Sequence, residues 1–144
     1  MEKKKILSAT KIIDIRFNEV DSMGVVWHGH YATFFEDARE EFGRKYGLEY
    51  LMMYDKGFFE PLVELNFKYK KPLIYGMSPE IYIEYHPCDA AKIIFDYEIR
   101  DPKSKEVFAT GHSVQIFMDK TNYQLVLTNP DFYEEWKQKW EVNG

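Results

Sequence analysis

A single long helical pattern, with strand patterns on either side of it, constrains the fold of this chain more than any other feature. Over roughly residues 30–46, apolar side chains recur at the spacing of one helix face, and polar residues fill the other face. Gly47 follows as a C-cap glycine. The apolar face carries Tyr31, Phe34, Phe35, Ala38, Phe42 and Tyr46. One-sided burial against a sheet would explain why this face is so aromatic.

Strand patterns account for most of the remaining chain. Residues 13–18 alternate apolar and polar side chains, which predicts a half-buried strand before the helix. Residues 131–140 predict a short C-terminal helix, with Pro130 near its first turn. Four further strands are predicted after the long helix, at residues 63–70, 81–86, 93–100 and about 106–118.

The order of these elements predicts an α+β fold with a five-stranded antiparallel sheet, because strands joined by tight turns pair antiparallel. One amphipathic helix cannot cover both faces of such a sheet. The other face then needs cover, and a second subunit is the simplest source of it, so we expect at least a dimer. The length of 144 residues suits a single domain spanning residues 1–144.

Composition excludes several classes of protein. The net charge of −5, from 19 basic and 24 acidic residues, argues against a nucleic-acid partner. No apolar run is long enough for a membrane span or a signal peptide. The single cysteine, Cys88, excludes an internal disulfide framework and suits a reducing compartment, so we expect a cytoplasmic protein.

The loop that joins the first strand to the long helix carries the residues most suited to chemistry. It contains Asp21, two glycines and two histidines. The N–H groups at the start of a helix can polarise a carbonyl oxygen, and a nearby carboxylate can attack the carbonyl carbon or activate water. Gly24 would allow close backbone approach. On chemistry alone, Asp21 can equally be a turn or cap residue.

Three segments of the chain resemble one known family. The first segment reads Asp21-x-x-Gly24-x-Val26-Trp27-His28-x-x-Tyr31-x-x-Phe34-Phe35-Glu36. It resembles the signature of the 4-hydroxybenzoyl-CoA thioesterase-like hotdog family. Residues 69–76 and 109–119 resemble that family's segment after the second strand and its last strand.

The resemblance implies a hotdog fold, in which a five-stranded antiparallel sheet wraps around one long central helix. It also implies homodimers or homotetramers with active sites at the subunit interface. The implied reaction is hydrolysis of an acyl-CoA or acyl-carrier-protein thioester, with coenzyme A as part of the substrate and no other cofactor. Asp21 matches the catalytic aspartate, a nucleophile or a general base, and His28 matches the residue whose backbone N–H points at the thioester carbonyl.

The same resemblance suggests residues for substrate and coenzyme A. His30 stands where the family usually has Asn. Some hotdog thioesterases use a helix carboxylate as the catalytic acid or base, but the position of Glu36 looks more like that of a structural carboxylate that bonds across the subunit interface. The lysines considered for coenzyme A phosphates can also be ordinary solvated strand residues. Predicted substrate contacts are Gly24, Val26, Trp27, His28, His30, Tyr31 and Glu36, and predicted phosphate contacts are Lys68, Lys70, Lys71 and Lys92.

Three alternatives stay open from the residues. Asp21, His28, His30 and Glu36 are ligand types that zinc accepts, although no further His/Cys cluster completes a site. A hotdog domain can also act as an acyl-thioester hydratase or as a binding module without catalysis.

The size and polarity of the acyl group are not encoded in any motif. Aromatic residues after the helix that are suited to line its pocket are Tyr54, Phe58 and Phe59.

Overall fold

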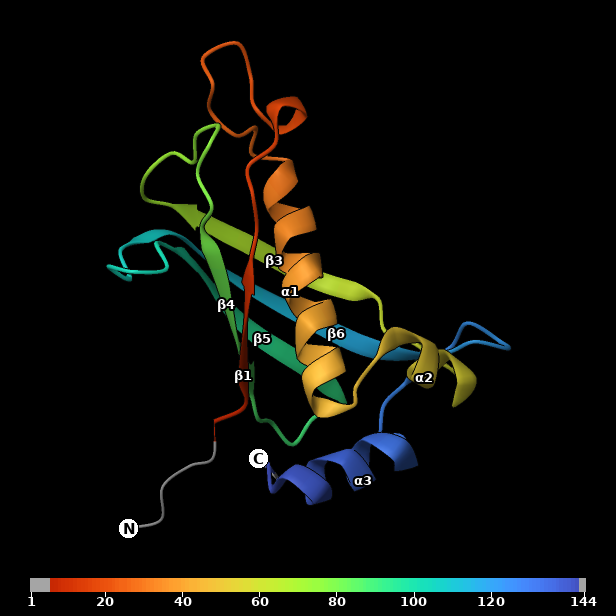
Figure 1. Ribbon diagram of the computed structural model, residues 1–144. Helices are drawn as coiled ribbons and strands as arrows, with labels where there is room; N and C mark the ends of the chain where they lie inside the picture. Colours follow the sequence, from red (N-terminus) through yellow and green to blue (C-terminus); the bar gives the residue numbers. More distant parts are fainter. Residues whose placement is uncertain (1–5, 143–144) are drawn as a thin grey trace.

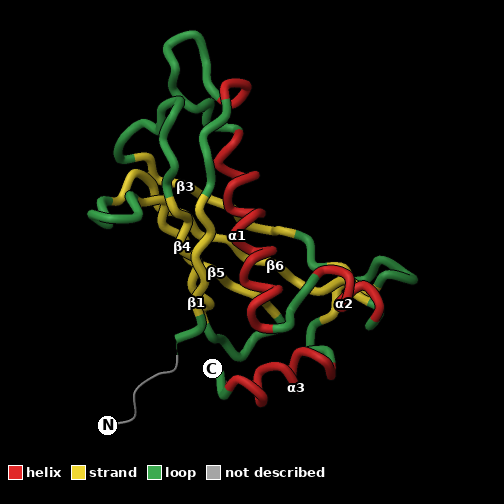
Figure 2. Tube along the Cα trace, viewed as in Figure 1, coloured by secondary structure: helices red, strands yellow, loops and turns green. Residues whose placement is uncertain are grey.

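The computed structural model of the chain describes residues 6–142. Its longest helix, α1 (His30–Tyr46), lies across one face of an antiparallel sheet, as Figures 1 and 2 show. A second helix, α3 (Asp131–Trp140), lies beyond the C-terminal end of α1. The arrangement of one long helix against a strongly bent antiparallel sheet is the α+β fold that the element order predicts.

The sheet follows the order β1-β4-β5-β6, and β3, β2 and β7 also pair with β6. All of these pairings are antiparallel. β3 is therefore an edge strand within the described residues, because β6 is its single partner. The strands are β1 (Ser8–Ile12), β2 (Phe58–Phe59), β3 (Leu62–Tyr69), β4 (Glu80–His86), β5 (Lys92–Arg100), β6 (Val107–Asp119) and β7 (Leu125–Val126).

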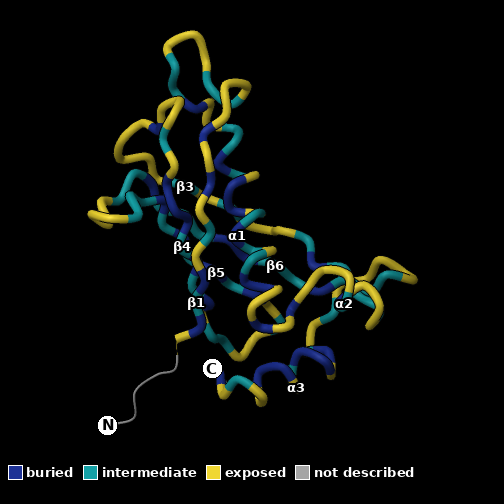
Figure 3. Tube along the Cα trace, in the orientation of Figure 1, coloured by how far each residue is buried: buried dark blue, intermediate teal, exposed yellow. Residues whose placement is uncertain are grey.

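The core lies between the aromatic face of α1 and the sheet, where Figure 3 shows the buried part of the chain. The Phe35 ring of α1 stacks on Tyr97 of β5 with ring centroids 4.4 Å apart. Gly111 of β6 makes this close approach possible. A Cβ atom at Gly111 would lie 2.5 Å from Cε2 of Phe35, which is too close for any side chain without movement. The absence of a side chain at this position therefore fixes the height of α1 above the sheet.

Both predicted helices are confirmed at residues 30–46 and 131–140. The C-cap is also confirmed, because Gly47 has φ of 78° and donates its N–H to the Gly43 carbonyl at 2.8 Å. No pattern in the sequence predicts the short helix α2 (Tyr50–Asp55) or the 3₁₀ turn η1 (Phe17–Glu19).

Two strand predictions need correction. The first strand is β1 at residues 8–12, not residues 13–18. Ile13 and Ile15 alternate inward as the pattern requires, but their N–H groups bond only to the carbonyls of Pro79 and Met77, so the pairing is too sparse for a strand. The sheet also has seven strands rather than five, because the two-residue strands β2 and β7 extend it along β6.

The outer face of the sheet, away from α1, carries its own polar surface. His112 of β6 lies 2.7 Å from Asp96 of β5 through Nδ1 and 3.3 Å from Glu64 of β3 through Nε2. His86 of β4 lies 3.6 Å from the second oxygen of Asp96. This face therefore does not by itself require a second subunit, contrary to the reason given by the sequence pattern. The edge of the sheet at β3 is a different surface from this outer face, and it has no second strand beside it within the described residues.

We expect Gly111→Ala to lower the free energy of unfolding by about 1–3 kcal/mol, because the added methyl overpacks the contact with Phe35. Urea unfolding would measure the change. The neighbouring variant Thr110→Val, on the outer face of β6, is the matched control and should change stability by no more than about 0.5 kcal/mol. An unchanged unfolding midpoint for Gly111→Ala would contradict the close approach.

Candidate active site

The loop before α1 forms a short hairpin with Asp21 at its turn. The N–H of Asp21 donates to the Val25 carbonyl at 2.8 Å, and the N–H of Gly24 donates to the Asp21 carbonyl at 3.0 Å. Gly24 has φ of 76°, a left-handed conformation that favours glycine. The hairpin is the exposed loop that projects beyond the helix start in Figure 3. Its tight turn explains the spacing between the aspartate and the glycine.

One of the two carboxylate oxygens of Asp21 forms hydrogen bonds within this turn. Its Oδ1 accepts hydrogen bonds from the N–H of Met23 at 2.8 Å and from that of Val25 at 3.3 Å. Within residues 6–142, its Oδ2 accepts no hydrogen bond. The alternative of a turn residue is thus correct for one oxygen, and it leaves the other oxygen available for chemistry.

The hairpin is tied to the body of the protein by the segment after β3. The N–H of Val26 donates to the Leu73 carbonyl at 2.8 Å, and the N–H of Tyr75 donates to the Gly24 carbonyl at 3.0 Å. The N–H of Trp27 closes the base of the hairpin by donating to the Glu19 carbonyl at 3.0 Å. Asp21 and the start of α1 therefore belong to one hydrogen-bonded unit.

The start of α1 presents backbone donors. The N–H groups of His30 and Tyr31 donate to the carbonyls of Trp27 and His28. In the part of the chain that the structure describes, the N–H groups of His28 and Gly29 reach no protein acceptor. Unpaired N–H groups at a helix N-terminus attract an oxygen that carries negative charge. These two groups have the chemistry of an oxyanion hole.

The indole of Trp27 covers this helix start. Its ring centroid lies 5.0 Å from that of His28 and 5.6 Å from that of His30. A Cβ atom at Gly29 would lie 2.0 Å from Cζ3 of Trp27. Glycine at this position therefore lets the aromatic ring lie directly against the backbone.

A cavity of about 490 Å³ opens beside the helix start. Tyr31 forms its buried wall, and its ring lies 4.9 Å from that of Tyr69. Burial, with the nearby Tyr69 hydroxyl, raises the pKa of Tyr31, so its hydroxyl remains a neutral donor at physiological pH. The lining residues of this first cavity are Val25, Val26, His28, Tyr31, Tyr69, Lys70, Lys71 and Pro72.

The structure brings together much of the predicted site. Five of the predicted residues line the first cavity, whereas Gly24, Trp27 and Asp21 lie in the adjoining loop, and His30 packs on Trp27. Asp21 does not line the first cavity of its own chain. The five residues that line the cavity are Val26, His28, Tyr31, Lys70 and Lys71.

Three of the residues predicted as substrate or phosphate contacts lie away from the first cavity. Glu36 is six positions along α1 from His30, a rise of about 9 Å, and it lines a different cavity. Lys92 begins β5 opposite Ile116, at the far end of β6 from the end of β3. Lys68 is an exposed residue of β3 that lines neither cavity.

The alternative metal site is not formed. Within residues 6–142, no group of three or more His, Cys, Asp and Glu side chains has an arrangement that could hold a metal ion. His28 precedes α1 and His30 begins it, while Glu36 faces the other cavity. The helix start thus separates the proposed ligands.

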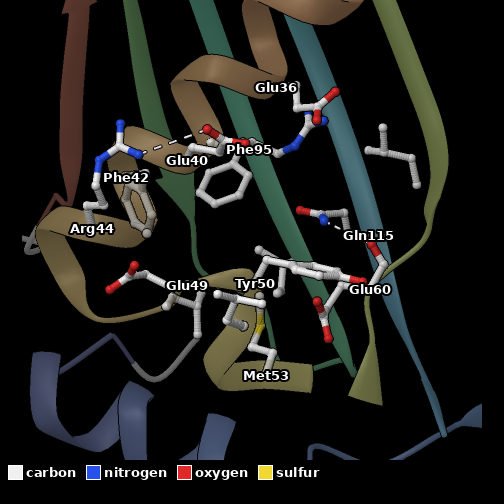
Figure 4. A pocket seen from close by; sticks show the side chains of 16 residues that line it. Glu36, Glu40, Phe42, Arg44, Glu49, Tyr50, Met53, Glu60, Phe95 and Gln115 are labelled. Carbon is white, nitrogen blue, oxygen red and sulfur yellow. Dashed lines mark hydrogen bonds and ion pairs between the residues drawn. The ribbon is translucent and has the colours of Figure 1, made fainter. Parts of the chain in front are cut away.

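A second cavity, of about 580 Å³, lies between the C-terminal half of α1, α2 and the sheet. Figure 4 shows Glu36 and Glu40 on its helix side and Glu60 and Gln115 on its strand side. It is lined by Glu36, Arg39, Glu40, Phe42, Gly43, Arg44, Leu48, Glu49, Tyr50, Leu51, Met53, Glu60, Leu62, Ile93, Phe95 and Gln115.

The prediction for the stretch after α1 is right about the segment and wrong about the residues. Tyr50 and Met53 of α2 line the second cavity, whereas Tyr54, Phe58 and Phe59 line neither cavity. The side chains of these three residues lie on faces of α2 and β2 that are not part of either cavity lining. The sequence pattern did not predict α2, so it could not predict which of its residues line a cavity.

Glu60 is the functional candidate that the sequence pattern missed. It is 8% exposed, and its Oε2 has no hydrogen-bond partner within the described residues. Burial raises the pKa of Glu60 to about 8, so the carboxyl group holds its proton at neutral pH. The available signal was a single acid between Phe59 and Pro61, in an otherwise apolar stretch.

Comparison with known proteins identifies the family. The family model of the thioesterase-like superfamily matches residues 15–136. The chain is also 30% identical over 131 residues to the putative acyl-CoA thioesterase YneP of Bacillus subtilis, covering 91% of this chain and 94% of that protein.

The chain belongs to the thioesterase-like superfamily. It is therefore a thioester hydrolase with a hotdog fold. The DHNA-CoA thioesterase of Staphylococcus aureus superposes with a TM-score of 0.78 at 28% identity, covering 93% of this chain and 91% of that one. A protein from Thermus thermophilus superposes with a TM-score of 0.79 at 25% identity, over 95% and 98% of the two chains. None of the described helices of this thioesterase is long and apolar enough to span a membrane.

The raised pKa of Glu60 predicts a dependence of stability on pH. Between the ordinary pKa of 4.5 and about 8, the folded state keeps a proton that the unfolded state has lost. The free energy of unfolding contributed by Glu60 therefore falls as the pH rises through this window. We expect Glu60→Gln to gain stability relative to the wild type across the same window and to keep that gain at higher pH.

Urea unfolding of both proteins at about pH 5 and about pH 8, near the two ends of the pKa window of Glu60, measures the difference in stability between Glu60→Gln and the wild type. Glu40→Gln, an exposed glutamate on the rim of the same cavity, is the matched control and should show no such gain. A stability difference for Glu60→Gln that is equal at both pH values would contradict the buried, neutral carboxyl group.

Proposed function

We propose that this thioesterase hydrolyses acyl-CoA with Asp21 as its catalytic carboxylate and the N–H groups of His28 and Gly29 as its oxyanion hole. One observation carries the proposal. Two unpaired backbone donors lie at the start of α1, beside a cavity and in the same hydrogen-bonded unit as a carboxylate with a free oxygen. The acyl-CoA activity named for YneP and the DHNA-CoA activity named for the staphylococcal enzyme support this substrate class.

In the proposed reaction, the thioester carbonyl oxygen accepts hydrogen bonds from the two N–H groups. Negative charge that develops on this oxygen is stabilised by the helix start. Asp21 either attacks the carbonyl carbon or takes a proton from the water that does so. The carbon–sulfur bond breaks, coenzyme A leaves as the thiol, and one water is consumed to give the free acid.

Lys70 is the proposed contact for coenzyme A phosphates, because it lines the first cavity and is exposed. Lys71 lines the same cavity but pairs with Glu106 at 2.6 Å, so it would have to exchange that partner for phosphate. Lys68 and Lys92 lie outside the cavity and are not part of the proposal.

The hydratase alternative is not favoured. It would pair an acid with a histidine, but no hydrogen bond joins Asp21 to His28 or His30 in the described part of the chain. Both imidazole rings pack on Trp27 instead.

A cytoplasmic location, expected from the single cysteine, stays a prediction.

We further propose that two copies of the chain pair antiparallel through the open edge of β3. Leu62, Val63 and Tyr69 expose apolar surface on this strand, which has β6 as its single partner within residues 6–142. An unpaired apolar strand edge readily pairs with a second chain. A two-fold axis would place the start of one β3 beside the end of the other.

This pairing would also complete the site. The first cavity lies at the end of β3, and the second cavity lies at its start. In a two-fold dimer, the first cavity of one copy would therefore adjoin the second cavity of its partner. The Asp21 hairpin would then lie at the boundary between the two copies.

We expect Asp21→Asn to reduce kcat by at least about 100-fold, because the amide has the shape of the carboxylate without its basicity. Release of coenzyme A thiol from a panel of acyl-CoA substrates measures the change. Asp89→Asn, in the exposed turn between β4 and β5, is the matched control and should retain activity. Near-normal hydrolysis by Asp21→Asn would refute the proposed role.

We expect Val63→Lys to convert the dimer to a monomer and to lower activity at least about 10-fold. The added positive charge would face the end of β3 in the second copy, which has Lys68 and Lys70 there because the two chains are identical. Like charges on opposite strands repel. Light scattering after size-exclusion chromatography measures the mass. Val63→Thr is the uncharged control and should stay dimeric. A Val63→Lys protein that remains an active dimer would exclude this edge as the interface.

A further inference from the structure

A purely hydrocarbon ligand in the second cavity would offer no hydrogen-bond partner to the carboxyl group of Glu60. This cavity combines the apolar side chains of Phe42, Phe95, Ile93 and Met53 with charged side chains of α1. Ligand pockets of this size are mostly apolar, with a few polar groups that fix the orientation of the ligand. Glu60 is such a group, because it is more than nine-tenths buried and its Oε2 has no partner in the described part of the chain.

Glu60 is held in place by its backbone rather than by its side chain. The Nε2 of Gln115 donates to the Glu60 carbonyl oxygen at 2.9 Å, an interaction drawn in Figure 4. Pro61 follows Glu60 and restricts its backbone to an extended conformation. The carboxyl group is thus presented to the cavity from a fixed position, and its Oε2 has no hydrogen-bond partner among residues 6–142.

No cation in the described part of the chain neutralises Glu60. Of the nearest arginines, Arg39 donates to the Tyr97 hydroxyl at 3.0 Å, and Arg44 bonds Glu41 at 2.8 Å. Neither forms an ion pair with Glu60. The other charged or titratable residues around the cavity are Glu36, Glu40, Glu49 and Tyr50. With no cation beside it, the buried group is a neutral acid, which donates one hydrogen bond through its O–H.

We infer that Glu60 is a specificity-determining residue whose carboxyl group hydrogen-bonds an oxygen on the acyl group of the substrate. The enzyme would then select acyl-CoA thioesters that carry a hydroxyl or oxo group over their hydrocarbon counterparts. This inference rests on the proposed function and on the dimer in which the second cavity adjoins the thioester site of the partner. The acyl group would extend from the α1 start of one copy into the Glu60 cavity of the other.

The physical basis of the selection is the cost of an unpaired polar group. A site built to hydrogen-bond a ligand oxygen discriminates strongly against the analogue that lacks it, because the buried protein group is left without a partner. Hydrocarbon walls alone distinguish such analogues weakly. Among the described residues that line this cavity, Glu60 is the single buried acid, so it would dominate the choice between them.

Matched substrate pairs test the inference. The probes are hydroxyalkanoyl-CoA and alkanoyl-CoA of equal chain length, together with hydroxybenzoyl-CoA and benzoyl-CoA. We expect the wild type to prefer the oxygenated member of at least one pair by about 10-fold or more in kcat/KM. Glu60→Leu should abolish this preference, chiefly by lowering kcat/KM for the oxygenated member. Glu60→Gln retains an N–H donor and should keep most of the preference.

A second readout covers a Glu60→Leu protein that fails to fold. For an oxoalkanoyl-CoA compared with its alkanoyl counterpart, the wild-type preference should fall as the pH rises past about 8, where Glu60 ionises and can no longer donate to the oxo oxygen. A hydroxyl substrate can still donate to the ionised carboxylate, so the oxo pair carries this readout. The preference of Glu60→Gln should stay flat over the same range. Equal use of both members of every pair by the wild type, or an unchanged preference in Glu60→Leu, would overturn the inference. Either result would leave the proposed function intact if hydrolysis still depends on Asp21, whereas full activity in Asp21→Asn would refute the proposed function itself.

Discussion

The packing of the aromatic face of α1 against the sheet determines where each candidate site residue lies. Phe35 approaches β6 so closely that position 111 has room for glycine alone. With the helix at this height and direction, its first turn and the end of β3 line the first cavity, and its C-terminal half and the start of β3 line the second cavity. The two cavities at the ends of α1 are consequences of this one contact.

The hairpin before α1 adds the chemistry to this scaffold. Its backbone is bonded to the segment after β3 and to Glu19, so the carboxylate of Asp21 and the unpaired donors of His28 and Gly29 share one framework. Donors that are fixed before the substrate arrives need little rearrangement during the reaction, which is why a helix start suits an oxyanion. The same framework leaves Asp21 at the surface of an isolated chain. In the proposed dimer, antiparallel pairing of β3 would place Asp21 over a chamber made by both chains.

Sequence reasoning recovered the parts of this structure that depend on local periodicity. The 3.6-residue period of the α1 face and the Gly47 cap fixed both ends of the helix, and the alternation in β4 to β6 identified the central strands. The order of Asp21, Gly24 and His28 located the loop that meets the first cavity. Each of these signals lies within a few consecutive residues.

The missed features depend on contacts between segments that are far apart in the sequence. Ile13 and Ile15 alternate as a strand does, but whether they form a ladder depends on residues 77–79, which pair with them only in part. Glu36 belongs to the motif in sequence and to another cavity in space, because helix geometry carries it away from the loop. Glu60 has no motif at all. Its importance follows from its burial beside the second cavity and from the bond that Gln115 makes to its carbonyl, which no local pattern encodes.

The most direct test of this account is a crystal structure of the enzyme with a non-cleavable thioether analogue of a hydroxyacyl-CoA. The analogue keeps its carbonyl but has a methylene between the sulfur and the carbonyl carbon. The account predicts that this carbonyl oxygen accepts hydrogen bonds from the N–H groups of His28 and Gly29 in one copy, with Asp21 beside it. It predicts the acyl oxygen within hydrogen-bond distance of Glu60 in the partner copy. An analogue bound away from the helix start, or an acyl group that avoids the second cavity, would contradict it.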